Sequence, residues 1–293
     1  SNVDRSVTFH LDGMIDDEPV SLSLASNRLR TFFSKRDKIK LDLNANLVGS
    51  NIKLDGNVDL PITRRSFIID FAVDGKRLDQ WNILIKQKLP PYGPYQLKGQ
   101  LRISSNGLQV NDMKAIIGES DLGGELNIDT SSELATWDFN LVSSKLQIKD
   151  FDVEGYSLFN RVTTEIPVNQ KKAAGPRPRQ MLKANEQWMG DELQQLPPIK
   201  ASIRLNARKV VSGDDHLGDG NLHALMTENS IALESLHLNI PGGRIDGSLH
   251  VERTDEGVDG HLKLDMEKFE YGILYRYINP ESPAKGLLTT KVD

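Results

Sequence analysis

The chain has 293 residues, no cysteine and a formal net charge of −5 at pH 7. The lack of cysteine excludes disulfides, thiolate metal ligands and cysteine nucleophiles. The acidic balance provides no basic field for nucleic acid, so no nucleic-acid partner is expected. No apolar run reaches the roughly 18 residues of a membrane-spanning helix.

Apolar and polar residues alternate along most of the chain, which is the pattern of β-strands with one buried face. In chain order the alternation is clearest at residues 39–47, 52–60, 67–73, 97–103, 122–128, 137–141, 199–207, 245–251 and 258–266. Short turn sequences such as Ser105-Asn106-Gly107 separate these runs, so consecutive strands should pair antiparallel. The pattern predicts about fifteen strands.

Three segments have helical spacing instead. They are residues 78–85, which run into Pro90 and Pro91, residues 181–196 with an apolar stripe, and residues 269–278, which stop before Pro280. The sequence therefore predicts about three short helices beside the strands.

The composition changes between residues 162 and 179, where the chain is basic and has no periodicity. A patch for anionic headgroups is one interpretation, but a solvated linker is favoured. We therefore predict a β repeat region at 1–160, a flexible basic linker with an amphipathic helix at 161–197, and a second β repeat region at 198–293. The last residues read as a strand that is just beginning, so we expect the sequence to be a piece of a longer protein.

The apolar faces of so many strands need a cover. A helix is about 10 Å across and strands lie about 4.8 Å apart, so one helix covers about two strands. Three short helices leave more than half of the sheet uncovered. Either the sheet closes on itself as a barrel or sandwich, or it forms a groove that holds a lipid-like ligand.

One turn-and-strand pattern occurs twice, at residues 116–129 and, about 120 residues later, at residues 239–252. Gly124 and Gly247 share the parity of the apolar residues in their strands. A glycine there leaves room for a bend, or for the close approach of a ligand or neighbouring backbone. A plain bulge without ligand remains the alternative.

Candidate chemistry is sparse. His223, His237, His250 and His261 share the polar parity of their strands, but a metal site would need three of them to converge, and exposed histidines are favoured. The serines lack a nucleophile-elbow context, and no glycine loop for phosphate occurs. We expect no cofactor, no metal and no enzymatic activity.

Several segments resemble a repeat of the AsmA family. In the first half these are residues 89–99, 107–118, 120–129 and 141–151, and in the second half residues 242–247 and 269–278. The resemblance implies a large periplasmic protein of Gram-negative bacteria, tethered to the inner membrane by an anchor that this sequence lacks. It also implies a long curled sheet with an apolar channel and a role in outer-membrane lipid homeostasis. The implied activity is the carriage of phospholipids between the two membranes.

The expected fold is thus mainly β, a long curled antiparallel sheet that forms an elongated apolar groove. The expected cargo is a phospholipid or another acyl-chain lipid, with envelope proteins as further partners. The alternative is a structural or assembly scaffold for outer-membrane proteins, as in TamB-like relatives, with a self-packed β core and no lipid. The predicted groove lining shares one strand parity and consists of Leu41, Leu43, Ile69, Phe71, Leu101, Ile103, Leu126, Ile128, Phe139, Leu141, Ile203, Leu205, Leu249, Val251, Leu262 and Leu264.

Overall fold

The structure is a computed structural model. It describes residues 7–16, 18–26, 38–59, 67–85, 89–152, 199–255, 257–273, 276 and 283–293. The predicted linker at 161–197 lies outside these residues, so the predicted domain boundaries stay predictions.

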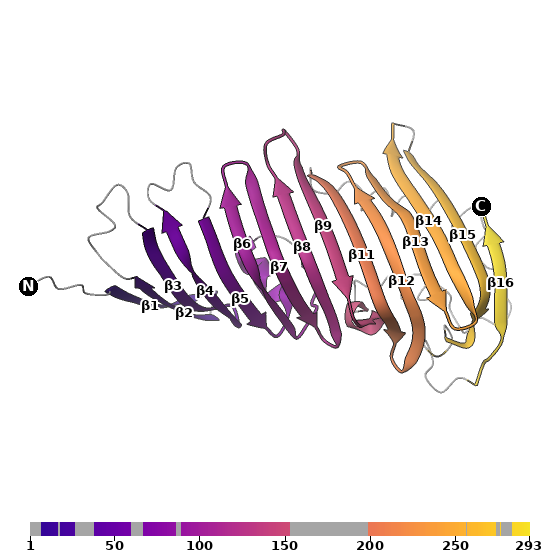
Figure 1. The fold of residues 1–293 in the computed structure, drawn as a ribbon, viewed down its shortest axis with the longest axis horizontal. Coiled ribbons are helices and arrows are strands. Elements are labelled where there is room, and N and C mark those ends of the chain that lie inside the picture. Colours follow the sequence, from indigo (N-terminus) through magenta and orange to yellow (C-terminus); the bar gives the residue numbers. More distant parts are fainter. Residues whose placement is uncertain are drawn as a thin grey trace, which may run out of the picture. The chain divides into compact units, whose positions relative to one another are not determined.

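The described strands form one large open sheet of sixteen strands (Figure 1). Along the sheet the order follows the chain from β1 to β9 and from β11 to β16, while the short β10 pairs parallel to β11. Consecutive strands pair antiparallel, for example β3 with β4 and β14 with β15. The prediction of a mainly β, antiparallel fold is confirmed. The strands are β1 (Val7–Ile15), β2 (Glu18–Ser26), β3 (Lys38–Leu47), β4 (Ser50–Asp59), β5 (Phe67–Gly75), β6 (Tyr95–Ser104), β7 (Gly107–Ile117), β8 (Ser120–Asp129), β9 (Ala135–Ser143), β10 (Leu146–Gln147), β11 (Ile199–Ser212), β12 (Asp215–Met226), β13 (Ser230–Ile240), β14 (Gly243–Thr254), β15 (Gly257–Glu270) and β16 (Leu287–Val292).

The prediction of about three helices is wrong for the described part of the chain. Residues 78–85 form the 3₁₀ turn η3 (Leu78–Trp81) and the short helix α1 (Asn82–Ile85), and a second 3₁₀ turn, η4 (Ile148–Phe151), was not predicted. Phe269 and Glu270 still belong to β15, because their partners Leu288 and Leu287 continue the ladder. Of the described residues in the predicted segment 269–278, Gly272, Ile273 and Arg276 are helical. The predicted helix at 181–196 lies outside the described residues.

The chain forms two compact units. Unit 1 comprises residues 1–133 and 140–142, and unit 2 comprises residues 134–139 and 143–293. All sixteen strands belong to one sheet, so within the described ranges no second sheet covers either face.

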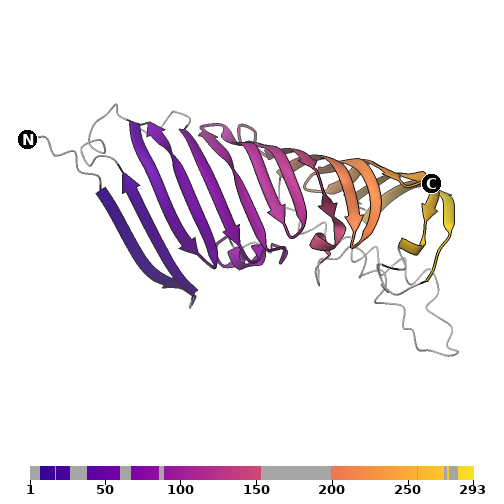
Figure 2. The same cartoon turned by 60° about the horizontal axis from the view of Figure 1, so that its bottom comes forward.

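Unit 1 is closed at the strand ends that carry the turns 47–50 and 117–120, which we call its sealed end. Tyr95 is only 5% exposed there, and its hydroxyl accepts a hydrogen bond from Trp81 Nε1 at 2.6 Å and shares one of 2.8 Å with the buried Ser50 hydroxyl. The turn η3 thus places Trp81 against Tyr95, the first residue of β6. Figure 2 shows η3 and α1, in purple, beside the lower ends of the unit 1 strands.

Unit 2 has its own sealed end, at the turns 212–215 and 240–243. An apolar cluster fills it, made of Ala207, Val210, Leu217, Ile240, Phe269 and Ile273, with Leu146 and Ile148 from the η4 region packed against it. Polar contacts fix the chain over this cluster. The Arg276 guanidinium makes hydrogen bonds of 2.9 to 3.2 Å to the Asp215 carboxylate, and Glu270 Oε1 accepts from the backbone N–H groups of Gly272 and Gly286, each at 3.0 Å.

The repeated turn and strand of the sequence is part of a larger internal repeat. β7 and β8 place Val110 opposite Leu126 and Met113 opposite Gly124, and β13 and β14 place Leu233 opposite Leu249 and Leu236 opposite Gly247. Each position of the second set lies 123 residues after its counterpart, and each set brackets a bulge. Even a turn hydrogen bond recurs at this offset, from Thr130 N to Asn106 O and from Arg253 N to Asn229 O.

The offset extends over four strands. Leu101 lies opposite Val110 in β6 and β7, and the matching Ala224 lies opposite Leu233 in β12 and β13. Leu264, opposite Gly247, matches Leu141, whose Cα lies 3.1 Å from where a Cβ on Gly124 would be. We call β6 to β9 copy 1 and β12 to β15 copy 2.

Candidate functional site

Each unit has one continuous apolar face, because cross-strand partners lie on the same side of a sheet. In unit 1 the registers align apolar residues across successive strands. One such row is Phe9, Leu24, Leu43, Leu54, Phe71 and Gly99, and a second is Leu11, Leu22, Ala45, Ile52, Val73, Leu97, Ala115 and Leu122. The alternation in the sequence therefore produces a face and not isolated contacts.

In unit 2 the apolar face consists of four rows, of which the outer two contain exposed residues and the inner two contain none. We call the strand ends opposite the sealed end, where β12 ends at Met226 and β14 ends at Thr254, the open end of unit 2. From the open end inward the rows are Ala201, Met226, Ile231, Val251 and Gly260; Ile203, Ala224, Leu233, Leu249 and Leu262; Leu205, Leu222, Leu236, Gly247 and Leu264; and Ala207, Gly220, Leu238, Ile245 and Met266. In the outer rows Ile231 is 40% exposed and Leu262 is 49% exposed, whereas Ile240 and Phe269 at the sealed end are 7% and 4% exposed.

All sixteen predicted lining residues lie in strands. Cross-strand pairing brings members of this set onto the apolar face of their unit, as in the run from Ile69 through Leu101 and Val110 to Leu126, and in the run from Leu249 to Leu262. Ile69 is buried, Ile203, Leu249 and Leu262 are exposed, and the rest are half-buried. That this face is the wall of a lipid groove stays a prediction.

The opposite face of each unit is mainly polar, although Ile68 and Ile116 of unit 1 are exposed on it. Asn44, Asp70, Asn127 and Asn206 are all exposed. Amide and carboxylate side chains link neighbouring strands of unit 1, for example Asn51 Nδ2 to Asp74 Oδ2 at 2.9 Å and Gln100 Nε2 to Asp70 Oδ1 at 3.2 Å. One surface hollow of unit 1 lies on this polar side, between His10, Ser23, Asn44, Asn51, Lys53 and Asp74 among others.

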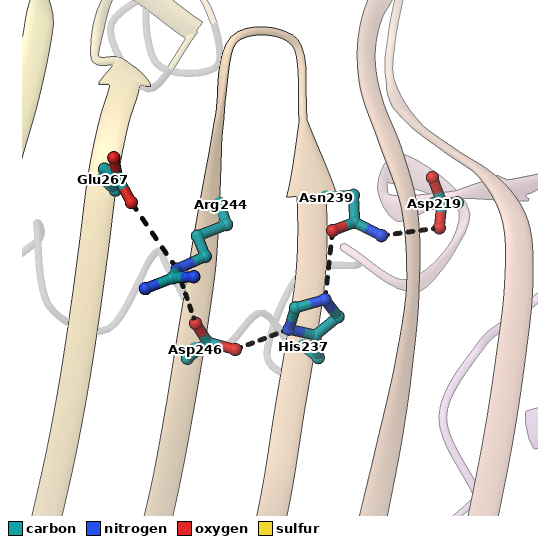
Figure 3. A network of polar contacts seen from close by, with 6 residues as sticks. All are labelled: Asp219, His237, Asn239, Arg244, Asp246 and Glu267. Carbon is teal, nitrogen blue, oxygen red and sulfur yellow. Dashed lines mark hydrogen bonds and ion pairs between the residues drawn. The ribbon is translucent and has the colours of Figure 1, made fainter.

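A chain of polar contacts crosses four strands on the polar face of unit 2 (Figure 3). Asn239 donates to Asp219 at 2.9 Å and contacts His237 at 3.0 Å, and His237 Nδ1 lies 2.5 Å from Asp246 Oδ1. On its other side Arg244 Nε lies 3.2 Å from Asp246 and 3.7 Å from Glu267. The hydrogen bond that His237 Nδ1–H donates to the Asp246 carboxylate raises the pKa of His237, because it favours the protonated ring.

The four histidines singled out in the sequence lie on this same face, and His250 is directly opposite His261. Each of these two approaches an acid of its own strand, His250 with Glu252 and His261 with Asp259, both at 3.6 Å. No group of three metal-ligating side chains with suitable geometry occurs among the described residues.

Sequence reasoning missed several residues that define the face. Phe9 and Leu11 in β1 are 53% and 50% exposed on the apolar side, and the alternation of residues 7–15 was the signal for them. Tyr95 and Phe269, which close the two sealed ends, carried no recognisable signal, because their partners lie far away in the chain.

The family model of the AsmA family matches residues 38–293. This chain belongs to the AsmA family. The match covers both copies of the repeat, and AsmA membership fits a role in lipid transport or in the cell envelope in general. The family is not known to be enzymatic.

No curated protein and no solved structure matches the chain significantly. None of the described helices is long and apolar enough to cross a membrane.

Proposed function

We propose that this AsmA-family chain is a periplasmic lipid-binding module that carries phospholipids between the inner and outer membranes. In this proposal the acyl chains lie on the apolar faces of the two units, and the full-length protein is anchored in the inner membrane. The module has no enzymatic activity.

The observation that supports this proposal is a continuous apolar face in each unit, opposite a face that is mainly polar. Leu249 and Leu262 are 37% and 49% exposed. They belong to the same cross-strand row as Ile203 and Leu233, so the exposed apolar surface is continuous. Water in contact with such a row costs about 25 cal/mol for each Å² of apolar surface. An acyl chain has no hydrogen-bonding groups, so it can cover this row without leaving a polar group unpaired.

The test uses adjacent residues of one strand as matched probes. Photo-crosslinking residues at Leu126 and Leu249 should capture phospholipid in cells, whereas probes at the neighbouring Asn127 and His250 should not. The side-chain direction alternates along a strand, so each control differs only in the face that it samples. Equal capture from both faces, or none from either in a folded protein, would contradict lipid carriage on the apolar face.

A second test separates cargo from packing. Leu249→Asp places a charge on the apolar face at a position that is already 37% exposed, so the variant should fold with an unchanged circular dichroism spectrum. It should nevertheless fail to complement an envelope-lipid defect, because an unpaired charge beside an acyl chain costs several kcal/mol or is neutralised. Ser248→Asp, on the polar face of the same strand, is the control.

A scaffold without lipid is the second candidate, and the self-packed cluster around Ile240 and Phe269 favours it. In that case the apolar face contributes only to stability or to contact with outer-membrane proteins under assembly. A Leu249→Asp variant that is folded and fully active, together with lipid-free protein after extraction, would support the scaffold.

A further inference from the structure

The open end of the apolar face in unit 2 is bordered by a cation. Arg253 follows Val251 in the parity of β14 and lies opposite Val258, one step beyond the outermost apolar row. Its side chain is exposed and therefore emerges where the apolar face meets water. An arginine at such a border can bury its methylene stem along apolar surface while its guanidinium stays hydrated.

The charge of Arg253 is not neutralised within the described part of the chain. Its Nη2 donates a hydrogen bond of 2.7 Å to Asn229 Oδ1, and its backbone N–H donates one of 2.9 Å to Asn229 O. Asn229 is neutral, so it orients the guanidinium without cancelling its charge. By contrast, Arg244 and Arg276 both lie within ion-pair distance of carboxylates. The remaining donors of Arg253 are available to an anion.

The length of the face below Arg253 suits the tail of a membrane lipid. From Val251 to Ile245 the apolar rows of β14 run over six residues, which is about 20 Å at about 3.3 Å per residue. One leaflet of a bilayer has a hydrocarbon depth of about 15 Å, half of the core thickness. A tail of that length that starts at the open end therefore fits along these rows, and the buried Ile240 and Phe269 lie beyond its end.

We propose that Arg253 binds the phosphate of a lipid headgroup while the acyl tail lies along β14 and β15 toward the sealed end of unit 2. This inference rests on the proposed function and adds the headgroup chemistry and the direction of the lipid. The planar guanidinium, held by Asn229, offers two parallel donors to phosphate oxygens. Copy 1 has Thr130 at the matching position, so its open end lacks this charge.

The first experiment titrates the purified chain with dioleoyl phosphatidic acid and, separately, with dioleoylglycerol, which has the same tails and no phosphate. Arg253→Gln should bind phosphatidic acid about tenfold more weakly, the effect of one charge-assisted contact, and dioleoylglycerol as tightly as the unchanged protein. Arg204→Gln makes the same change on the polar face, where Arg204 lies opposite His223, and should bind both lipids normally.

Binding of neither lipid by the unchanged protein contradicts the proposed function itself. Binding of both lipids with equal affinity by the unchanged protein and by Arg253→Gln leaves lipid carriage intact and overturns the role of Arg253. If inorganic phosphate displaces phosphatidic acid at comparable concentrations, Arg253 is a site for free anions and the lipid assignment is wrong.

The second experiment measures direction. The chain has no cysteine, so Val251→Cys and Ile245→Cys each give a single labelling site for a fluorophore. A nitroxide near the headgroup end of the lipid should quench the label at 251 more strongly, and a nitroxide at the methyl end should quench the label at 245. The opposite order, or equal quenching at both depths, would overturn the proposed direction.

Discussion

Copy 1 and copy 2 have the same strand register and the same bulge, but different side chains surround the bulge. In copy 1, Gly124 has φ +140°, and a Cβ built on it would lie 2.0 Å from Asn140 O. In copy 2, the nearest atom to a Cβ on Gly247 is Lys263 O at 3.5 Å, an ordinary contact. Both glycines lie beside a bulge, but only Gly124 is required by the close approach of neighbouring backbone. The same sequence pattern thus has two physical causes.

The two copies also differ in what their outer faces carry. His237, Asp246 and Asn239 of copy 2 correspond to Lys114, Gly123 and Ile116 of copy 1, and Ile116 is 46% exposed. Copy 2 therefore has a cross-strand network of hydrogen bonds and ion pairs where copy 1 has a glycine and an exposed isoleucine. Because copies that diverge on one face but keep the other are constrained mainly on the kept face, the apolar side is the shared requirement.

The largest expected effect separates the two glycines. Gly124→Ala should lower the free energy of unfolding by about 3 kcal/mol, because alanine is strained at this φ and its methyl group would overlap Asn140 O. Gly247→Ala, the matched control, should change stability by less than about 1 kcal/mol. Urea unfolding followed by circular dichroism measures both. Equal destabilisation would show that the glycines serve one purpose after all.

The next effect concerns how each unit closes its sealed end. Tyr95→Phe removes the partner of Trp81 Nε1 and of the fully buried Ser50 hydroxyl, so it should cost about 1–3 kcal/mol. Arg276→Gln in unit 2 breaks a partly exposed ion pair with Asp215 and should cost about 1 kcal/mol or less. A larger loss for Arg276→Gln than for Tyr95→Phe in the same unfolding assay would mean that the ion pair, and not the apolar cluster, closes unit 2.

The smallest effect is a pH dependence specific to copy 2. Because Asp246 raises the pKa of His237, the folded state binds the proton more tightly than the unfolded state does. The resulting stability is fully present below the unfolded pKa of about 6.5 and is lost as the pH rises through the higher folded pKa. Both side chains are about two-fifths exposed, 38% and 42%, so water screens the effect and it should be small.

In thermal unfolding, the stability of the unchanged protein should fall between about pH 6 and about pH 8.5. The stability of His237→Gln should fall less over the same range. His261→Gln, which removes a histidine from the same polar face, should retain the dependence of the unchanged protein. If His237→Gln and the unchanged protein have the same pH profile, the contact between His237 and Asp246 is not the cause of the pH dependence.

Much of the site could be predicted from the sequence. Period-two alternation fixes which side of a sheet each residue occupies, so Leu126, Leu249 and the other lining residues share a face in any antiparallel pairing that keeps the parity. The repeat at residues 116–129 and 239–252 was visible for the same reason, because turns and alternation are local. The residues between the apolar positions of each strand point to the other side of the sheet, so the alternation predicts the polar face as well.

Only the tertiary structure decided depth, closure and partners. Alternation gives Leu249 and Ile240 equal apolar character, yet Leu249 is 37% and Ile240 7% exposed, because Phe269 and Ile273 fold over one end only. The strand continuing through Phe269, in place of a predicted helix, depended on its ladder with β16. Arg253 is oriented by a hydrogen bond to Asn229, which lies 24 residues earlier in the chain. No local sequence pattern specifies that these two residues meet. Sidedness is encoded residue by residue, whereas depth and pairing arise from contacts between distant segments.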